Sequence, residues 1–219
     1  MSRTGFQRAR QPEQKEQRRR ELLDAAARLL ADGGLEAVSL SAIARTAGLA
    51  KSNVYRYFGS REEILLEILV DDEQSWVGEL ERQLSPLAGS GDVDAVAETL
   101  ARTIAARPVT CTLISVVANV LEHNTTPEAV LQFKSRVLEL TIRIRNALHA
   151  ALPALPHEQT EALLRYLHAL VAGLWPMANP APLAGELMEQ PQFRGMCTEL
   201  EADLRGALAA MLHGLVPRR

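Results

Sequence analysis

Apolar residues recur at helical spacing along most of this chain. Leu22, Leu23, Ala26, Leu29 and Leu30 stand at positions i, i+1, i+4, i+7 and i+8, which places their side chains on one face of a helix. Later apolar stretches repeat this period, and none alternates with the period of two that a half-buried strand requires. The 219-residue sequence therefore predicts an all-α fold with about nine helices.

Capping residues indicate where these helices begin and end. Gly33 and Gly34 supply a left-handed stop for the first helix, and Ser39 is a good N-cap for a second, short one. Ser60 opens a capping box for a long helix over 61–84. Thr126-Pro127 begins another that runs to about residue 152. The remaining apolar stripes predict helices over about 51–57, 92–106, 108–121, 157–178 and 193–214.

Charge is distributed unevenly along the chain. The net charge is −3, but residues 1–61 hold 12 basic and 6 acidic residues, whereas residues 62–219 hold 12 and 21. This asymmetry favours a basic module that faces a polyanion and an acidic body with another role. Residues 1–13, with three arginines among polar residues, are expected to form a disordered basic arm. We expect a DNA-binding domain over 14–60 and a helical domain over 61–219.

Several classes of protein are excluded. Two cysteines, Cys111 and Cys197, provide neither a disulfide framework nor a CxxC metal motif. No apolar run approaches the ~20 residues of a membrane span, and the N-terminus lacks the apolar segment of a secretory signal. The five histidines are scattered, and no phosphate-binding glycine motif occurs. We therefore expect a cytoplasmic protein that is not an enzyme, with no metal, cofactor or membrane partner.

The stretch from Ser39 to Phe58 has the pattern of a helix–turn–helix. Two short helices are joined by a turn at Gly48, a residue that tolerates a left-handed conformation. Apolar residues are spaced to lock the two helices together: Leu40, Ile43, Ala44, Leu49 and Val54. The second helix then presents short polar and basic side chains at its N-terminal half, as the recognition helix of a DNA-binding protein does.

Individual side chains in this stretch suit the major groove of double-stranded DNA. Asn53 can bond adenine in a bidentate manner, and Lys51 can reach the O6 and N7 of guanine. Ser39 and Ser41 stand at a helix N-terminus, where backbone N–H groups attract a phosphate. Of the two aromatic residues that follow, we expect Phe58 to be buried and Tyr57 to be exposed.

The chain resembles the DNA-binding domain of TetR-type transcriptional repressors over about residues 17–66. The resemblance rests on the run GLEAVSLSAIA over 34–44, AGL over 47–49, VYRYF over 54–58 and SREEIL over 60–65. It implies DNA contacts at Ser39, Ser41, Lys51, Ser52, Asn53, Tyr55, Arg56, Tyr57 and Arg61, with Tyr55 and Arg61 on phosphates. Ala50 departs from the usual capping serine and removes one expected phosphate contact, and Ser52 replaces a frequent glycine.

The resemblance also implies an all-helical homodimer that binds a palindromic operator through its first three helices. A larger helical domain would dimerise and bind a small-molecule inducer. We therefore expect a homodimeric repressor that an effector releases from DNA. The alternative is a TetR-like activator, or a DNA-binding regulator without a ligand; a cavity within residues 62–152 would favour the ligand-responsive form.

The effector pocket is expected among the helices over about 62–152. Its candidate wall residues are Trp76, Leu80, Cys111, Ile114, Ser115, Ala118, Asn119, Leu121, Glu122, His123, Phe133 and Trp175. Asn119 and His123 share one helical face and could orient a polar ligand group, although His123 equally suits a role at the helix end. Cys111 is expected to be an inert buried thiol. With few aromatic residues, the pocket suits a lipophilic or acyl-like effector.

Two C-terminal helices carry wide aliphatic faces that could form a four-helix bundle between two copies. The residues expected at this dimer interface are Leu163, Leu167, Leu170, Leu174, Leu200, Leu204, Leu208 and Met211. Alternatively, the same residues close the core of a single protomer.

Overall fold

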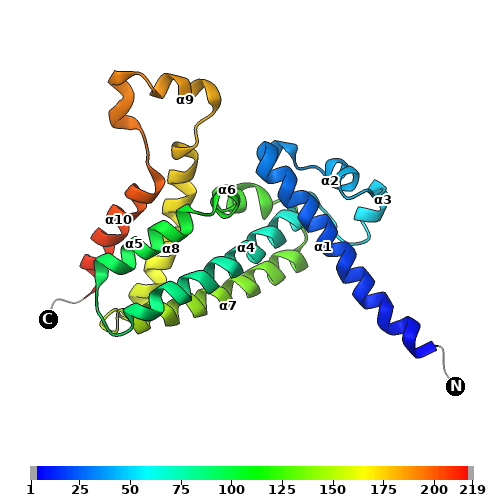
Figure 1. The fold of residues 1–219 in the computed structure, drawn as a ribbon, viewed down its shortest axis with the longest axis horizontal. Coiled ribbons are helices and arrows are strands. Elements are labelled where there is room, and N and C mark those ends of the chain that lie inside the picture. Colours follow the sequence, from blue (N-terminus) through cyan, green and yellow to red (C-terminus); the bar gives the residue numbers. More distant parts are fainter. Residues whose placement is uncertain (1–3, 217–219) are drawn as a thin grey trace.

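The long helix α4 (Arg61–Leu84) joins the two parts of the molecule (Figure 1). The computed structural model describes the backbone of residues 4–216 and the side chains of residues 13–216. Over that range the chain forms ten α-helices and three short segments of 3-10 or π-helix, and no β-strand. The predicted all-α fold is confirmed.

The first helix is longer than the sequence predicts. α1 spans Thr4–Ala37 and its path breaks at Gly34, where φ is +66°, as the glycine stop indicated. The backbone is helical from Thr4, where we expected a disordered arm over residues 1–13; residues 1–3 lie outside the described part. An ion pair one turn apart, Arg20–Glu16, supports the helix ahead of its packed section.

The N-terminal part is a small three-helix unit. After α1 come α2 (Leu40–Thr46) and α3 (Lys51–Val54). Its core consists of side chains that are at most 2% exposed: Leu22, Ala25, Ala26, Val38, Ile43, Val54 and Phe58. The burial of Phe58 confirms one prediction, whereas Tyr57 is half-buried rather than exposed because it packs against this core.

The C-terminal part is a bundle around α4. That helix lies along α7 (Pro127–Ala151), while α5 (Val93–Ala105) packs on α10 (Leu200–Leu215). Between these pairs, α6 (Pro108–Val116) packs on α8 (His157–Ala178). Three capping side chains begin these helices, two of them, Ser60 and Thr126, as predicted. The side chains of Ser60, Asp92 and Thr126 each accept from the backbone N–H three residues on.

Three shorter segments complete the chain. A 3-10 turn, η1 (Ser85–Leu87), follows α4, and a π-helical turn, η2 (Val117–Leu121), ends α6. The helix α9 (Pro182–Met188) and the turn η3 (Pro191–Met196) pack on each other and project from the bundle between α8 and α10 (Figure 1).

No single helix within residues 4–216 has the length and apolar character needed to cross a membrane. The stretches Val93–Ala105 and Pro108–Leu121 meet such criteria only as a pair, and the chain bends by 86° between them.

Most of the leucines predicted at a dimer interface lie instead inside the protomer. Five are at most 8% exposed within a single chain: Leu163, Leu167, Leu200, Leu204 and Leu208. They are buried because α10 lies against α5 and α8, so the apolar stripes of these helices meet each other. Leu170, Leu174 and Met211 are only partly buried and lie at the edge of this contact.

Candidate nucleic-acid interface and ligand cavity

The α2–turn–α3 segment is held by local bonds that the sequence indicated. The Ser39 hydroxyl accepts from the Ala42 N–H at 3.1 Å and caps α2. Gly48 adopts φ +67°, which allows the Leu49 N–H to donate back to the Ala44 carbonyl at 2.8 Å. Ala50 occupies the N-cap position before α3 and, as expected of an alanine, provides no side-chain capping bond.

The recognition helix is shorter than the predicted helix over 51–57. Regular α-helix ends at Val54, and residues 55–58 continue as hydrogen-bonded turns. In these turns the Arg56 N–H donates to the Asn53 carbonyl, and the Tyr57 and Phe58 N–H groups donate to that of Val54. The chain tightens here because Phe58 turns inward to the core.

Most of the predicted DNA contacts lie on the outside of this unit. Six are exposed: Ser39, Ser41, Lys51, Ser52, Tyr55 and Arg56. Asn53, Tyr57 and Arg61 are partly buried. Within residues 13–216 neither Lys51 nor Arg56 forms an ion pair with a carboxylate, so both cations are available for contacts with DNA.

Arg61 has a different environment from Lys51 and Arg56. Its Nη1 donates to the Val38 carbonyl at 3.3 Å, while its Nε and Nη2 contact the Glu62 carboxylate at 3.1 and 2.9 Å. These bonds tie the start of α4 to the loop before α2. The phosphate contact expected of Arg61 would have to share the guanidinium with these partners.

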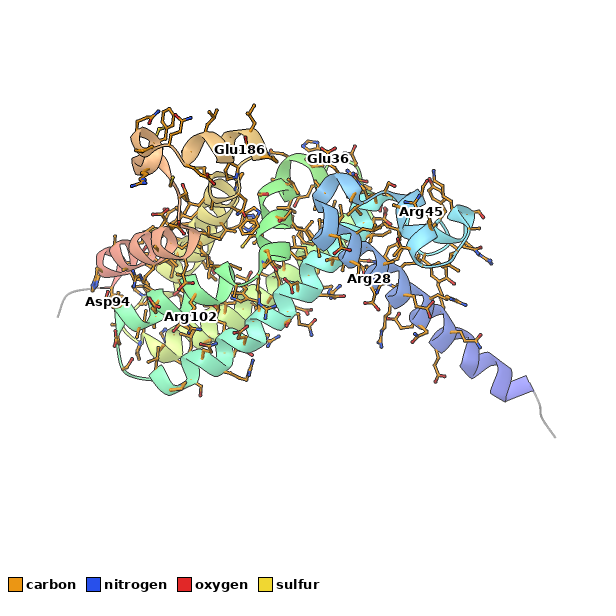
Figure 2. The ribbon with its side chains drawn as sticks, turned by 45° about the horizontal axis from the view of Figure 1, so that its top comes forward. Arg28, Glu36, Arg45, Asp94, Arg102 and Glu186 are labelled. Atoms are coloured by element: carbon orange, nitrogen blue, oxygen red, sulfur yellow. The ribbon has the colours of Figure 1, made fainter. Side chains whose placement is uncertain are left out.

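Arg45 is a further exposed cation that is not among the predicted DNA contacts. It lies in the last turn of α2, at the end of the molecule that holds the helix–turn–helix (Figure 2). Like Lys51, it makes no ion pair among the described side chains. The sequence could have identified Arg45 as a candidate DNA contact, because it is a basic residue within the helix–turn–helix.

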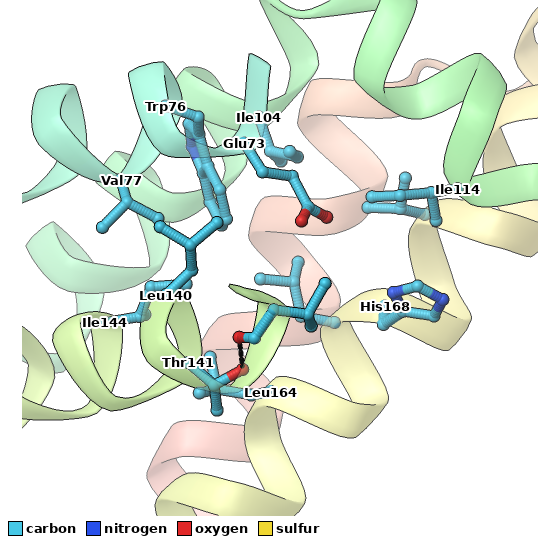
Figure 3. A pocket seen from close by; sticks show the side chains of 13 residues that line it. Glu73, Trp76, Val77, Ile104, Ile114, Leu140, Thr141, Ile144, Leu164 and His168 are labelled. Atoms are coloured by element: carbon cyan, nitrogen blue, oxygen red, sulfur yellow. Dashed lines mark hydrogen bonds between the residues drawn. The ribbon is translucent and has the colours of Figure 1, made fainter. Parts of the chain in front are cut away.

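The bundle contains a partly open cavity of about 90 Å³ (Figure 3). Helices α4, α5, α6, α7 and α8 all contribute to its wall. The lining residues are Glu73, Trp76, Val77, Ile104, Ile114, Val137, Leu140, Thr141, Ile144, Leu164, Leu167, His168 and Val171. The Trp76 indole N–H donates to the Thr103 hydroxyl at 3.0 Å and is therefore already satisfied.

Only Trp76 and Ile114 of the predicted pocket residues line this cavity. Leu80, Cys111 and Leu121 are buried in the core, and burial raises the pKa of the Cys111 thiol to about 12, as suits an inert group. Phe133 faces a separate groove, of about 630 Å³, between α1, α4 and α7. Trp175 instead donates its indole N–H to the Thr112 hydroxyl at 3.1 Å and holds α8 to α6.

The predicted wall residues after Ile114 fall outside the cavity because the helix changes its winding. In η2 the Glu122 N–H donates five residues back, to the Val117 carbonyl at 3.1 Å. Ala118, Asn119 and His123 are consequently exposed, and Ser115 and Glu122 are partly buried away from the cavity. The α-helical period of 3.6 residues, which placed these residues on the cavity face in the prediction, does not hold in a π-helical turn.

Two ionisable residues of the wall were missed, Glu73 and His168. Burial raises the pKa of Glu73 to about 7, and the neighbouring Asp72 adds to the shift. Burial lowers the pKa of His168, with a further contribution from Lys134 that Glu122 opposes. The sequence could have identified Glu73 as a candidate wall residue, because its carboxylate interrupts the apolar stripe of the helix over 61–84.

Two family models match the chain. One described as "Bacterial regulatory proteins, tetR family" covers residues 22–68. The other, described as "Tetracyclin repressor-like, C-terminal domain", covers residues 70–219.

Curated relatives align with about a quarter of the chain. The HTH-type transcriptional regulator BetI of Rhizobium meliloti is 49% identical over 49 residues, which make up 22% of this chain and 24% of that protein. The HTH-type transcriptional repressor KstR2 of Mycolicibacterium smegmatis is 42% identical over 60 residues, or 27% and 29% of the two chains. The matched stretch spans about a quarter of the length of these relatives.

Solved structures resemble almost the whole chain. The fatty acid degradation regulator FadR from Bacillus halodurans has a TM-score of 0.57 at 16% identity and covers 92% of this chain and 97% of its own. FadR from Thermus thermophilus, a TetR family transcriptional repressor in complex with lauroyl-CoA, has a TM-score of 0.59 at 15% identity, covering 92% and 96%. At these identities the similarity concerns the fold.

Proposed function

Because the chain belongs to the TetR family of bacterial regulatory proteins, we propose that it is a homodimeric repressor which binds a palindromic operator and is released by a small lipophilic effector. The family assignment itself confirms a DNA-binding transcriptional regulator and excludes an enzyme. Its place of action would be the cytoplasm, where operator DNA is found.

One observation carries the proposal: α4 belongs to both the DNA-binding unit and the cavity. At its start, Arg61 is bonded to the Val38 carbonyl of the helix–turn–helix. Three turns later, Glu73 and Trp76 line the cavity. At 1.5 Å per residue the two sites are about 18 Å apart along one rigid element.

The C-terminal half of α4 is anchored to its neighbours. Arg107 binds Asp72 at 3.1 Å and Glu79 at 2.9 Å, and Arg143 makes two bonds to Glu81 at 2.9 and 2.6 Å. Hydrogen bonds from these arginines lower the pKa values of Glu79 and Glu81. A ligand that separates α4 from α8 would therefore pivot the helix about these contacts and move its other end.

The cavity is too small for most effectors in this conformation. A cavity of about 150 Å³ accommodates benzene, whereas this one measures about 90 Å³. A larger ligand would bind only after α4, α7 and α8 separate, so it would favour a conformer with displaced helix–turn–helix units. Coupling of about 1–3 kcal/mol would give a graded release from DNA.

The proposed dimer would use the outer face of α8 and α10. On α8 this face exposes Tyr166 and Met177. On α10 it presents a stripe of small residues: Ala202, Gly206, Ala210 and Gly214. Such a stripe lets two helices approach closely, and a two-fold dimer would place two recognition helices in successive major grooves, about 34–36 Å apart.

Selection of bound sequences from a random duplex pool tests the proposal. A palindromic consensus with half-sites about one helical turn apart is the expected result, with binding that weakens steeply as salt is raised. Selection of a single half-site, or of no consensus, would contradict it. Transcription from the selected operator with and without the protein then distinguishes a repressor from an activator.

A further inference from the structure

Glu73 is an unusual residue to find in a mostly apolar cavity. Its carboxylate points into the cavity, on the side where Ile114 and His168 lie (Figure 3). It accepts no hydrogen bond from any side chain or backbone group of residues 13–216. An unpaired carboxylate in apolar surroundings is costly, and a ligand that carries hydrogen-bond donors would remove that cost.

The groups around Glu73 can be named element by element. α5 and α6 contribute only apolar side chains, Ile104 and Ile114, to the wall. On α4, the neighbouring Asp72 is paired with Arg107 outside the cavity. α7 supplies the Thr141 hydroxyl. α8 supplies the imidazole of His168, an exposed residue that is influenced by the charges of Lys134 and Glu122.

Most of the polar atoms available in the cavity are acceptors. The Thr141 hydroxyl donates its hydrogen to the Val137 carbonyl at 2.8 Å, so its oxygen is left to accept. The lowered pKa of His168 favours its neutral ring, which carries one acceptor nitrogen and one N–H donor. With the Glu73 carboxylate these make three acceptors; the His168 N–H is the remaining donor, because the indole N–H of Trp76 is occupied.

We propose that this cavity binds a hydrophobic primary amine, whose ammonium group pairs with Glu73 while its apolar body lies against Trp76 and the aliphatic wall. A primary ammonium has three N–H donors and no acceptor, which matches the Glu73, Thr141 and His168 set. A carboxylate ligand would find few donors, chiefly the His168 N–H, and would be repelled by the ionised Glu73 carboxylate. The inference deepens the proposed function, because it names the class of effector.

The proton balance of binding distinguishes the ligand classes. With a pKa of about 7, Glu73 is half-protonated at pH 7 in the free protein. An ammonium partner holds the carboxylate ionised, so binding releases about half a proton at pH 7. Amine affinity should accordingly rise with pH up to about 7 and then level off, whereas a carboxylate ligand would take up protons.

The experiment uses the full chain and three matched series of probes: butyl, hexyl and octyl amines, alcohols and carboxylates. Binding is measured by calorimetry in buffers of different ionisation enthalpy, which reports proton release. Fluorescence of Trp76 in a Trp175→Phe background, where Trp76 is the sole tryptophan, provides a second signal from the cavity wall. Neither measurement involves DNA.

We expect each amine to bind at least tenfold more tightly than its matched alcohol, with proton release at pH 7. Glu73→Gln should remove that preference and the proton release while leaving alcohol binding unchanged. Glu139→Gln, an exposed carboxylate on α7, is the matched control and should behave as the parent chain. Circular dichroism of each variant confirms that the fold is retained.

Equal binding of amine and alcohol, tightest binding of the carboxylate, or an unchanged amine affinity in Glu73→Gln would overturn the inference. DNA release is measured separately, by adding octylamine to the protein–operator complex. Amine binding without release would leave the cavity assignment in place and contradict the proposed regulation. Release by another effector, with no amine binding, would contradict the cavity assignment alone.

Discussion

Arg19 of α1 forms an ion pair with Glu67 of α4, and its guanidinium lies 4.4 Å from the centre of the Phe58 ring. It also donates to the Tyr57 carbonyl at 3.3 Å. Both charged side chains are mostly shielded, with 29% and 25% of their surfaces exposed. A single arginine thus connects α1, the segment after α3 and the first turns of α4.

Replacement of Arg19 should therefore weaken the DNA-binding unit. We expect Arg19→Met to lower the free energy of unfolding by about 1–3 kcal/mol, because the ion pair and the cation–π contact are lost together. Urea denaturation monitored by circular dichroism measures the change. Arg18→Met is the control, since Arg18 pairs with Glu21 at the exposed surface and should change stability by less than about 0.5 kcal/mol.

Lys51 and Arg56 should affect operator binding in different ways. Lys51→Ala is expected to reduce discrimination between related operators by about 1–3 kcal/mol, because Lys51 stands where side chains meet base edges. Arg56→Ala should weaken binding to all sequences alike and reduce the salt slope by about one. Titrations of two operators at several salt concentrations measure both effects. Identical behaviour of the two variants would contradict the division into base and phosphate contacts.

The stability of the protein should depend on Glu73 in a direction opposite to that of most carboxylates. The pKa of Glu73 is about 7 in the folded chain and about 4.5 in the unfolded chain, so the folded state binds its proton more tightly. The free energy of unfolding is therefore highest below about pH 4.5 and falls as the pH rises through 7. The free energy of unfolding of Glu73→Gln minus that of the parent chain should be about 2–3 kcal/mol larger at pH 8 than at pH 5. Urea unfolding at both pH values measures this difference; a constant offset would show that Glu73 does not titrate in the cavity.

The outer face of α10 provides a direct test of the dimer. A Cβ atom at Gly206 would meet nothing within 4 Å in the protomer, so Gly206→Arg should fold normally. We expect this variant to be monomeric in sedimentation and to bind the operator weakly. Leu204 lies on the inner face of α10, where its side chain is fully buried. Leu204→Ala should therefore lower the free energy of unfolding by about 2–5 kcal/mol. A Gly206→Arg dimer would place the interface elsewhere.

Local signals predicted the helices and the helix–turn–helix well. Ser39, Gly48 and Ser60 act through bonds to residues at most a few positions away, so their roles can be read without knowing the rest of the fold. The length of the recognition helix could not be read in this way. It depends on Phe58 turning inward to a core built partly from α1.

The cavity and the packing of the C-terminal helices were harder to predict for physical reasons. An apolar stripe looks the same whether it packs within one protomer or between two, and Leu204 and Leu208 pack within one. A π-helical turn gives no clear signal in the sequence, so Asn119 and His123 were assigned to the wrong face. Glu73 lies within an otherwise apolar stripe of α4, and a prediction based on apolar residues leaves such a charged residue out.

The small size of the cavity bears on the dose at which the proposed regulator would respond. If only a fraction of the molecules is expanded at any moment, the half-maximal effector concentration equals the intrinsic dissociation constant divided by that fraction. Tight packing around Trp76 would then act as a threshold, keeping genes silent at background metabolite levels. Trimming a wall side chain such as Leu164 should lower this threshold and make the response more sensitive, with no new contact to the ligand.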